Sequence, residues 1–279
     1  MSTIIRIGII GYGYVGRATA EAFRDVATVA WCDPNHAGSS SIQELCSTSD
    51  FLFVCVPTPQ CSDGSPDMAQ VNQVLAAISQ QTLSPPTLIK STVTPQTTAR
   101  LARLYPDINL AFIPEFLREK HYLEDARSPE RIVIGWTSTY TDNDRQKLRT
   151  LYQAAFKETP ILDTTATTAE LLKHTSNAFF ATKVIFANQM SALASTLSVD
   201  WEDVRSMLVL DTRIGSDHLA VPGHDGLAGF GGRCLPKDTA ALLFVADQLG
   251  VSLSVLRSAV QSNQRIRQQN VPELRSADL

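Results

Sequence analysis

The glycine-rich run over residues 229–238, Gly-Phe-Gly-Gly-Arg-Cys-Leu-Pro-Lys-Asp, is the part of the sequence best suited to chemistry. Its cysteine, Cys234, stands just before Pro236, a natural first residue of a helix. A thiol at a helix N-terminus, close to Arg233 and Lys237, should have a lowered pKa and be partly thiolate, the nucleophilic form. The alternative is a buried cysteine in a glycine-rich turn.

Lys173 and Asn177 lie four positions apart in a segment of helical pattern, so they share one face of a helix. An ammonium group can stabilise an alkoxide or oxyanion, and an amide can fix a water molecule beside it. Taken alone, such a pair is more often part of a solvated helix surface. The sequence leaves both interpretations open.

Three carboxylates are candidates for acid–base work. Glu115 and Glu119 follow a strand that is expected to end at Ile113, and ligands of α/β folds bind at that carboxyl edge. Either is a possible general base or merely a first-turn acid of a helix. Asp238, four residues after Cys234, is placed to orient a water or the thiol, or simply to cap its helix.

A glycine motif near the N-terminus predicts a dinucleotide site. The residues Gly11, Tyr12, Gly13, Tyr14, Val15 and Gly16 follow an apolar run and open a helical segment, and Asp33 ends the next apolar run about 20 residues on. Gly11 would make the tight turn, Gly13 would let the pyrophosphate approach the backbone, and Gly16 would allow close helix packing. The alternative is a structural glycine turn with an aspartate cap.

The residues around Asp33 distinguish between the two nicotinamide cofactors. Its carboxylate would accept hydrogen bonds from the ribose hydroxyls and repel a 2′-phosphate. No Arg or Lys lies within residues 32–41 to bind such a phosphate. The sequence therefore predicts NAD as the cofactor.

Alternating strands and helices must position these residues over the first half of the chain. Strands are predicted over Ile4–Ile10, Ala27–Cys32, Phe51–Val56, Thr87–Val93, Ile108–Ile113, Arg131–Gly135 and Pro160–Leu162. Helices are predicted over Arg17–Arg24, Ser41–Cys46, Asp67–Gln80 with Asp67 as N-cap, Pro95–Tyr105 and Asp144–Ala155. The fold class is therefore α/β, with a Rossmann-type doubly wound parallel sheet in an NAD-binding domain over residues 1–165.

The second half of the chain has only helical patterns. Helices are predicted over Glu170–Leu197, Trp201–Leu210, Pro236–Leu249 and Ser252–Gln269, in an all-helical domain over residues 166–279 that carries Cys234. The Glu170–Leu197 helix has no Gly or Pro and is apolar on more than one side, so several of its faces must be buried. A homodimer interface is one way to bury them, and a second layer within the chain is the other.

Composition excludes several classes of partner. The net charge is −4 and no Lys/Arg-rich run occurs, so no nucleic acid is expected. No apolar stretch approaches the length that spans a bilayer, so no membrane partner is expected. The five cysteines are odd in number and form no CxxC pair, which argues against disulfides and zinc and favours a cytoplasmic location. His218 and His224 have no nearby Cys or Glu, so no metal site is expected.

Together these motifs resemble the UDP-glucose/GDP-mannose dehydrogenase family. The matching segments come in the family's order and cover nearly the whole chain: residues 11–16, Val56-Pro57-Thr58-Pro59, Lys90-Ser91-Thr92-Val93, Pro114-Glu115-Phe116-Leu117-Arg118-Glu119, Lys173-x-x-x-Asn177, Arg213-Ile214-Gly215 and residues 229–238. The last run is the most specific.

The resemblance implies a four-electron oxidation of a nucleotide-sugar alcohol to a carboxylate with two NAD, through a thiohemiacetal and a thioester on Cys234. UDP-glucose is the expected substrate. It implies water placement and thioester hydrolysis by Glu119, Thr92 and Asp238, and oxyanion stabilisation by Lys173 and Asn177. Glu115 would support the substrate. The substrate would be contacted by Phe116, Leu117, Arg118 and Glu119, and by the 217–226 loop that ends at Gly226. Arg213 would reach the substrate across a dimer interface. Thr58, Thr92, Glu119 and Lys237 would join residues 11–16 and Asp33 at NAD.

Two departures and two alternatives stand beside this resemblance. Ile113 and Lys120 replace residues that the family usually has around the Pro114–Glu119 segment. Only residues 235–279 follow the cysteine, which predicts a short form without the C-terminal nucleotide-binding domain of larger members. A two-electron hydroxyacid dehydrogenase is one alternative, but it needs no nucleophilic thiol. A non-catalytic NAD-binding partner protein is the other, and the retention of every chemical residue argues against it.

Overall fold

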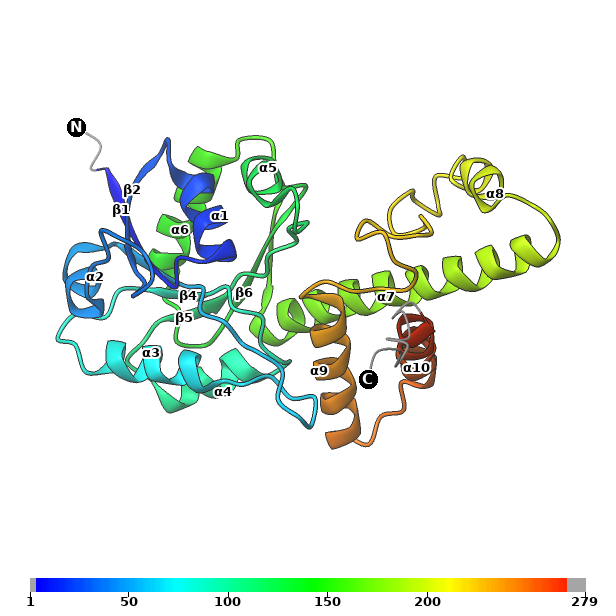
Figure 1. Cartoon of the computed structure of the whole chain (residues 1–279). Helices are drawn as coiled ribbons and strands as arrows, with labels where there is room; N and C mark the ends of the chain where they lie inside the picture. The colour runs from blue at the N-terminus through cyan, green and yellow to red at the C-terminus, as the bar shows by residue number, and fades with distance from the viewer. Residues whose placement is uncertain (1–3, 270–279) are drawn as a thin grey trace, which may run out of the picture. The chain divides into compact units, whose positions relative to one another are not determined.

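The computed structural model describes residues 4–269 of the chain. Two compact units are present (Figure 1). The first, here called the sheet unit, holds the residues up to Pro59 and those from Pro66 to Lys173. The second, the helical unit, holds Gln60–Ser65 and the residues from His174 on.

A seven-stranded sheet forms the centre of the sheet unit, with the order β2-β1-β3-β4-β5-β6-β7. Its first five strands pair in parallel, as predicted. β6 runs antiparallel to β5, and β7 is parallel to β6, so the prediction of an all-parallel sheet is wrong at one pair. The β5–β6 connection carries only a six-residue helix, rather than one that lies along the sheet and returns the chain to the starting edge. The strands are β1 Ile5–Ile10, β2 Ala27–Cys32, β3 Phe51–Val54, β4 Thr87–Ile89, β5 Leu110–Phe112, β6 Ile132–Trp136 and β7 Ile161–Thr165.

Helices cover both faces of this sheet, which confirms the doubly wound class (Figure 1). In β3, Leu52 and Val54 pack with α2, α3, α4 and the start of α7, whereas Phe51 and Phe53 pack with α1 and α6. The alternation follows from the two-residue period of a strand. The helices are α1 Tyr14–Phe23, α2 Ile42–Thr48, α3 Ala69–Ser79, α4 Thr97–Leu104, α5 Tyr122–Arg127 and α6 Asp142–Ala155.

Several boundaries differ from prediction. The N-cap of α3 is Met68 rather than Asp67, whose carboxylate accepts a 2.8 Å hydrogen bond from the Ala69 N–H from outside the helix. The short helix α5 was missed because six residues are too few for an apolar period. β4 ends at Ile89, since the N–H groups of Lys90 and Ser91 both donate to the Val54 carbonyl and end the regular ladder.

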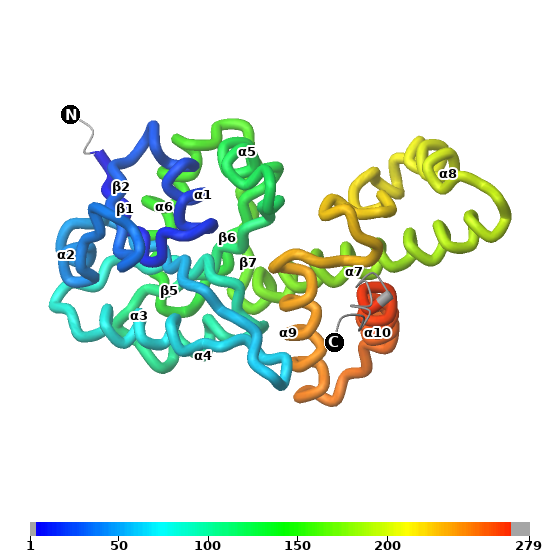
Figure 2. The backbone as a smooth tube through the Cα atoms, in the orientation of Figure 1, coloured from blue at the N-terminus to red at the C-terminus, as the bar shows by residue number. Residues whose placement is uncertain are grey.

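The helical unit contains most of α7 Ala166–Thr196, with α8 Trp201–Leu208, α9 Leu235–Gln248 and α10 Ser254–Gln269. The connection between α8 and α9 returns alongside α7 (Figure 2). Leu219 of this connection and Trp201 of α8 pack against Ala187 and Ala194 of α7, and the Trp201 indole N–H donates to the Leu219 carbonyl at 3.0 Å. Within residues 4–269, no helix is both long and apolar enough to cross a bilayer.

Candidate functional site

The glycine turn after β1 is fixed by the backbone around it. Gly11 has φ +91°, donates its N–H to the Cys32 carbonyl at 2.9 Å, and would place a Cβ only 2.8 Å from the Cys55 carbonyl oxygen. A Cβ at Gly16 would lie 2.1 Å from the Gly11 carbonyl oxygen. Neither position tolerates a side chain, because the opposing atoms belong to the backbone.

Unlike Gly11 and Gly16, Gly13 has free space where a side chain would stand. A Cβ at this position would meet nothing within 4 Å, and Gly13 is the N-cap of α1. No side chain caps the helix there, and its first turn holds no acidic residue. An uncapped helix N-terminus beside an unobstructed backbone suits a pyrophosphate.

Asp33 lies at the carboxyl end of β2, where a ribose is expected. Its carboxylate accepts the backbone N–H groups of Tyr12 at 2.7 Å and Asn35 at 2.9 Å. Burial alone would raise the pKa of Asp33, but these hydrogen bonds and the nearby His36 outweigh it and lower the pKa below its usual value. Asp33 is therefore an anion with a fixed orientation, and the turn as a whole fits NAD.

Two predicted cofactor residues, Thr58 and Thr92, meet at the carboxyl ends of β3 and β4. The Thr58 hydroxyl donates to the Thr92 carbonyl at 2.9 Å. The buried hydroxyl of Ser91 donates to the Val56 carbonyl at 2.7 Å. These bonds join the two loops at the edge where ligands of α/β folds bind.

Lys173 and Glu115 form a buried ion pair within the sheet unit. The Lys173 Nζ lies 2.9 Å from Glu115 Oε1 and donates to the Glu115 carbonyl at 2.7 Å. Lys173 is 4% exposed and Asn177 is 7% exposed, so the interpretation of this pair as a solvated helix surface is wrong.

The segment from Phe116 to Glu119 turns outward from this pair. Glu115 Oε2 accepts the Leu117 N–H at 2.9 Å, and the Arg118 guanidinium pairs with Asp125 of α5. The ring of Phe116 packs on the core, with the Arg131 guanidinium 4.4 Å from its centroid. Glu119 is exposed.

Cys234 is the N-cap of α9, and Pro236 stands in the first helical turn, as the sequence predicts. One turn later, Asp238 is 1% exposed and its N–H donates to the Cys234 carbonyl at 2.8 Å. The Asp238 carboxylate accepts from Lys237 Nζ at 2.6 Å on one oxygen and from the Asn177 amide on the other. Four predicted site residues thus lie together in the helical unit.

The loop that carries Arg213 is anchored by a residue that the sequence analysis did not single out. Lys183 of α7 donates from Nζ to the carbonyls of Ile214 at 3.0 Å and Gly215 at 2.9 Å. Arg213 pairs with Asp211, and its side chain is 87% exposed. Gly226, farther along the same connection, has φ +79° in a turn.

Two family models match the chain: the NAD-binding domain of the UDP-glucose/GDP-mannose dehydrogenase family over residues 26–156, and the central domain of that family over residues 167–265. The chain belongs to the UDP-glucose/GDP-mannose dehydrogenase family. The glycine turn at residues 11–16 precedes the matched range, so it is independent support for NAD, the cofactor that the first model names.

Named relatives agree with the family. UDP-glucose 6-dehydrogenase AglM of Haloferax volcanii is 30% identical over 93% of this chain and 69% of its own length. A UDP-glucose dehydrogenase structure from Pyrobaculum islandicum has a TM-score of 0.83 at 30% identity, over 95% of this chain and 69% of that one. The chain thus spans about two thirds of the length of these family members.

A likeness in fold alone extends further. A 3-hydroxyisobutyrate dehydrogenase from Mycobacterium tuberculosis has a TM-score of 0.73 at 14% identity, over 94% of both chains. The fold class that the sequence predicts, a doubly wound sheet followed by a helical region, is common to this enzyme and to the dehydrogenase family.

Buried polar residues that could not be assigned a role from the sequence include Glu170 and Asn188 of α7, and Asn263 of α10. The Glu170 carboxylate accepts the Thr98 N–H at 2.7 Å, and burial raises its pKa to about 7. A usable signal was present for Glu170 and Asn188, because a polar residue in a helix that is apolar on several sides needs a buried partner. By contrast, Cys46 and Cys55 are buried, and burial raises the pKa of Cys55 to about 12.

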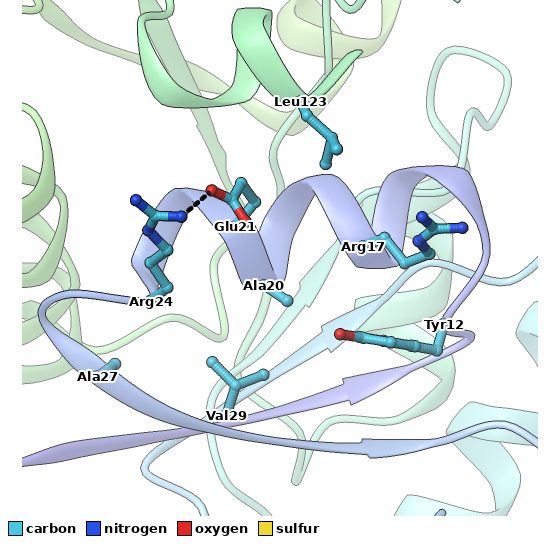
Figure 3. Close-up of a pocket in the computed structure, with 8 residues that line it drawn as sticks. All are labelled: Tyr12, Arg17, Ala20, Glu21, Arg24, Ala27, Val29 and Leu123. Carbon is cyan, nitrogen blue, oxygen red and sulfur yellow. Dashed lines mark ion pairs between the residues drawn. The ribbon is translucent and has the colours of Figure 1, made fainter. Parts of the chain in front are cut away.

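A hollow of about 420 Å³ lies along the outer side of α1 in this dehydrogenase (Figure 3). It is walled by α1, β2 and Leu123 of α5, with Tyr12 and Arg17 at one end. Glu21 and Arg24 pair across its wall at 2.8 Å. Because it follows the edge strand toward its amino end, we do not assign it to the cofactor.

Proposed function

We propose that this protein oxidises the primary alcohol of a nucleotide sugar to a carboxylate with two NAD, and that UDP-glucose is its substrate. The observation that carries the proposal is the placement of Cys234 at the N-terminus of α9, one turn before a buried Asp238 that Asn177 and Lys237 hold. In this proposal residues 1–165 bind NAD and residues 166–279 carry the cysteine.

The glycine turn, Asp33, Thr58 and Thr92 would hold NAD, together with Glu119 and Lys237. When bound, NAD would supply the hydride acceptor for each of the two oxidations, and the first oxidation also releases the hydroxyl proton of the alcohol to water. After the first, the sulfur of Cys234 adds to the carbonyl carbon of the aldehyde and the aldehyde oxygen gains a proton, which gives a thiohemiacetal. Loss of the second hydride and the hydroxyl proton leaves a thioester.

Hydrolysis of the thioester completes the reaction. A water adds to the thioester carbon, the carbon–sulfur bond breaks, and the products are the carboxylate and the free thiol. Glu119 would take the proton from this water, with Thr92 and Asp238 placing it. The buried ammonium of Lys173 and the Asn177 amide would stabilise the oxyanion that forms in this step.

The remaining predicted residues would bind the substrate. Glu115 orients Lys173 through their ion pair and so supports the substrate site indirectly as well as directly. Phe116, Leu117, Arg118 and Glu119 would contact the sugar nucleotide from one side and Gly226 from another. Arg213 would reach it from the partner protomer of a dimer.

We further propose a homodimer built on α7. Phe179, Phe186 and Leu193 are exposed and recur every seven residues, which places them on one side of the helix. Such a stripe is the kind of surface that a second copy of the same helix buries. Sedimentation of the wild type and of Phe186→Glu tests this: a dimer that the substitution dissociates is expected, and a wild-type monomer at all concentrations contradicts it.

The experiment that tests the function is a count of NADH formed per molecule of sugar. The protein with NAD and UDP-glucose should form two NADH per sugar, and Cys234→Ala should abolish carboxylate formation. Cys61→Ala is the matched control, because Cys61 is exposed in a separate loop. One NADH per molecule of a small hydroxyacid, unaffected by Cys234→Ala, would instead establish the two-electron alternative. NAD binding without turnover of any nucleotide sugar would establish the non-catalytic one. A cytoplasmic location stays a prediction.

A further inference from the structure

Gly229 and Phe230 begin the glycine-rich run that carries Cys234. Each of their backbone N–H and carbonyl groups is hydrogen-bonded to a side chain. The Gly229 N–H donates to Asn188 Oδ1 at 2.9 Å, and its carbonyl accepts from Arg267 at 2.9 Å. The Phe230 N–H donates to Asn263 Oδ1 at 2.7 Å, and its carbonyl accepts from Asn263 Nδ2 at 3.0 Å. This irregular segment is therefore as fully paired as a central strand.

Arg267 of α10 links this segment to the preceding turn. The same Nη2 that binds the Gly229 carbonyl also lies 2.8 Å from Asp225 Oδ2. Burial would raise the pKa of Asp225, but hydrogen bonds from Arg267 and from the Leu227 N–H outweigh it and lower the pKa. Asp225 is thus ionised, and the ion pair closes the loop over residues 225–229.

The packing against α10 leaves no room for a side chain at Gly229 or Gly231. Asn188 and Asn263 are both buried. A Cβ at Gly229 would lie 2.5 Å from Asn263 Oδ1, and one at Gly231 would lie 2.8 Å from Arg267 Nη2. The glycines therefore permit close contact between α10 and the segment that precedes the thiol.

We propose that Asn263 and Arg267 are positioning residues for Cys234, which fix the backbone from Gly229 onward so that the thiol is presented in one place at the start of α9. The proposal that this thiol forms a thioester is the function proposed above, and the positioning role deepens it. A merely structural role predicts a different result: lower stability, with the reactivity of the folded thiol unchanged.

The test measures the alkylation rate of Cys234 by iodoacetamide in full-length wild type, Asn263→Asp and Arg267→Lys. Asn263→Asp keeps the acceptor for Phe230 N–H but removes the donor to its carbonyl. Arg267→Lys keeps the charge opposite Asp225 but loses the planar guanidinium geometry. Exposed Arg265 of α10 gives the matched control Arg265→Lys, and Cys61 is the reference thiol within each sample.

We expect the alkylation rate of Cys234 to change by about threefold or more in both variants, while the rate at Cys61 and the Arg265→Lys control stay unchanged. In both variants kcat should fall while KM for NAD stays constant. Rates at Cys234 equal to wild type in folded protein would overturn the proposal. If Asn263→Asp does not fold, the half-buried Arg267→Lys decides alone. Because alkylation needs no turnover, absence of nucleotide-sugar oxidation would refute the proposed function while leaving this test intact.

Discussion

The Lys173 ammonium lies between the carbonyl and the carboxylate of Glu115, at 2.7 Å and 2.9 Å. The two residues are 58 positions apart, and both are buried. The carboxylate compensates the desolvated charge of the lysine. A cation that would stabilise an oxyanion is thus held by the acid that follows the β5 strand.

Lys173→Met should lower kcat by about 100-fold, because one oxyanion-stabilising group is lost. It should also lower the free energy of unfolding by about 3–5 kcal/mol, since Glu115 is left buried and unpaired. Activity per folded protein and urea unfolding measure the two effects. Lys147→Met is the control: its pair with Asp144 is 3.7 Å long and the lysine is 61% exposed, so little should change. Full kcat in folded Lys173→Met would exclude a role in the reaction.

Asp238→Asn should disturb the cluster at the start of α9. The substitution replaces one carboxylate oxygen, which accepts a hydrogen bond from Asn177 or from Lys237, with an NH2 group. At that contact two hydrogen-bond donors then face each other. We expect a loss of about 1–3 kcal/mol of unfolding free energy and a fall in kcat. Asp247 lies on the same helix and pairs with exposed Arg257, so Asp247→Asn should leave the free energy of unfolding nearly unchanged. Equal effects of the two substitutions on stability would show that the buried contacts of Asp238 contribute nothing special.

Gly13→Ala and Gly16→Ala should separate binding from folding. The Cβ that Gly13→Ala adds would enter open space, so the melting temperature should stay within a few degrees while the Kd for NAD rises about tenfold or more. Gly16→Ala should lower the melting temperature, because its Cβ would overlap the Gly11 carbonyl oxygen. Thermal unfolding and calorimetric titration with NAD measure both. Unchanged NAD affinity in Gly13→Ala would contradict the assigned cofactor site.

Stability should depend on pH through Glu170. Burial raises its pKa to about 7 in the folded protein from an ordinary value of 4.5. The folded state therefore binds more protons than the unfolded state in this range, and the free energy of unfolding falls as pH rises through it. Glu170→Gln removes this loss, so its stability relative to wild type should increase by about 2–3 kcal/mol between pH 5 and pH 8. Urea unfolding at both pH values checks this, with exposed Glu158→Gln as control. A difference independent of pH would refute it.

The fold was largely predictable, because buried strands and glycine turns leave local signals. β2 was predicted to the residue, and the glycine turn and the helix start at Cys234 follow from the residue types that such positions require. The antiparallel β6 was not predictable, since strand direction depends on the path of a connection whose short helix has no apolar period.

The site was predictable as residue types but not as partners. That Lys173 pairs with Glu115, or Asn263 with Phe230, depends on contacts between segments far apart in the chain. A lysine or an asparagine in a helix has the same local pattern whichever distant group it contacts. Lys183 shows this, since only the structure places its ammonium against the carbonyls of the Arg213 loop.

The contact between Gly16 and the Gly11 carbonyl oxygen has a consequence for degenerate relatives of this chain. The Cys55 backbone excludes a side chain at Gly11, and the Gly11 carbonyl oxygen excludes one at Gly16, whatever the protein binds. A descendant that had lost its cofactor would therefore still keep both glycines. Of the three glycines of the turn, only Gly13 faces open space, so the fold does not require a glycine there once the ligand is lost. In an inventory of such chains, the middle glycine distinguishes a working cofactor site from a surviving turn.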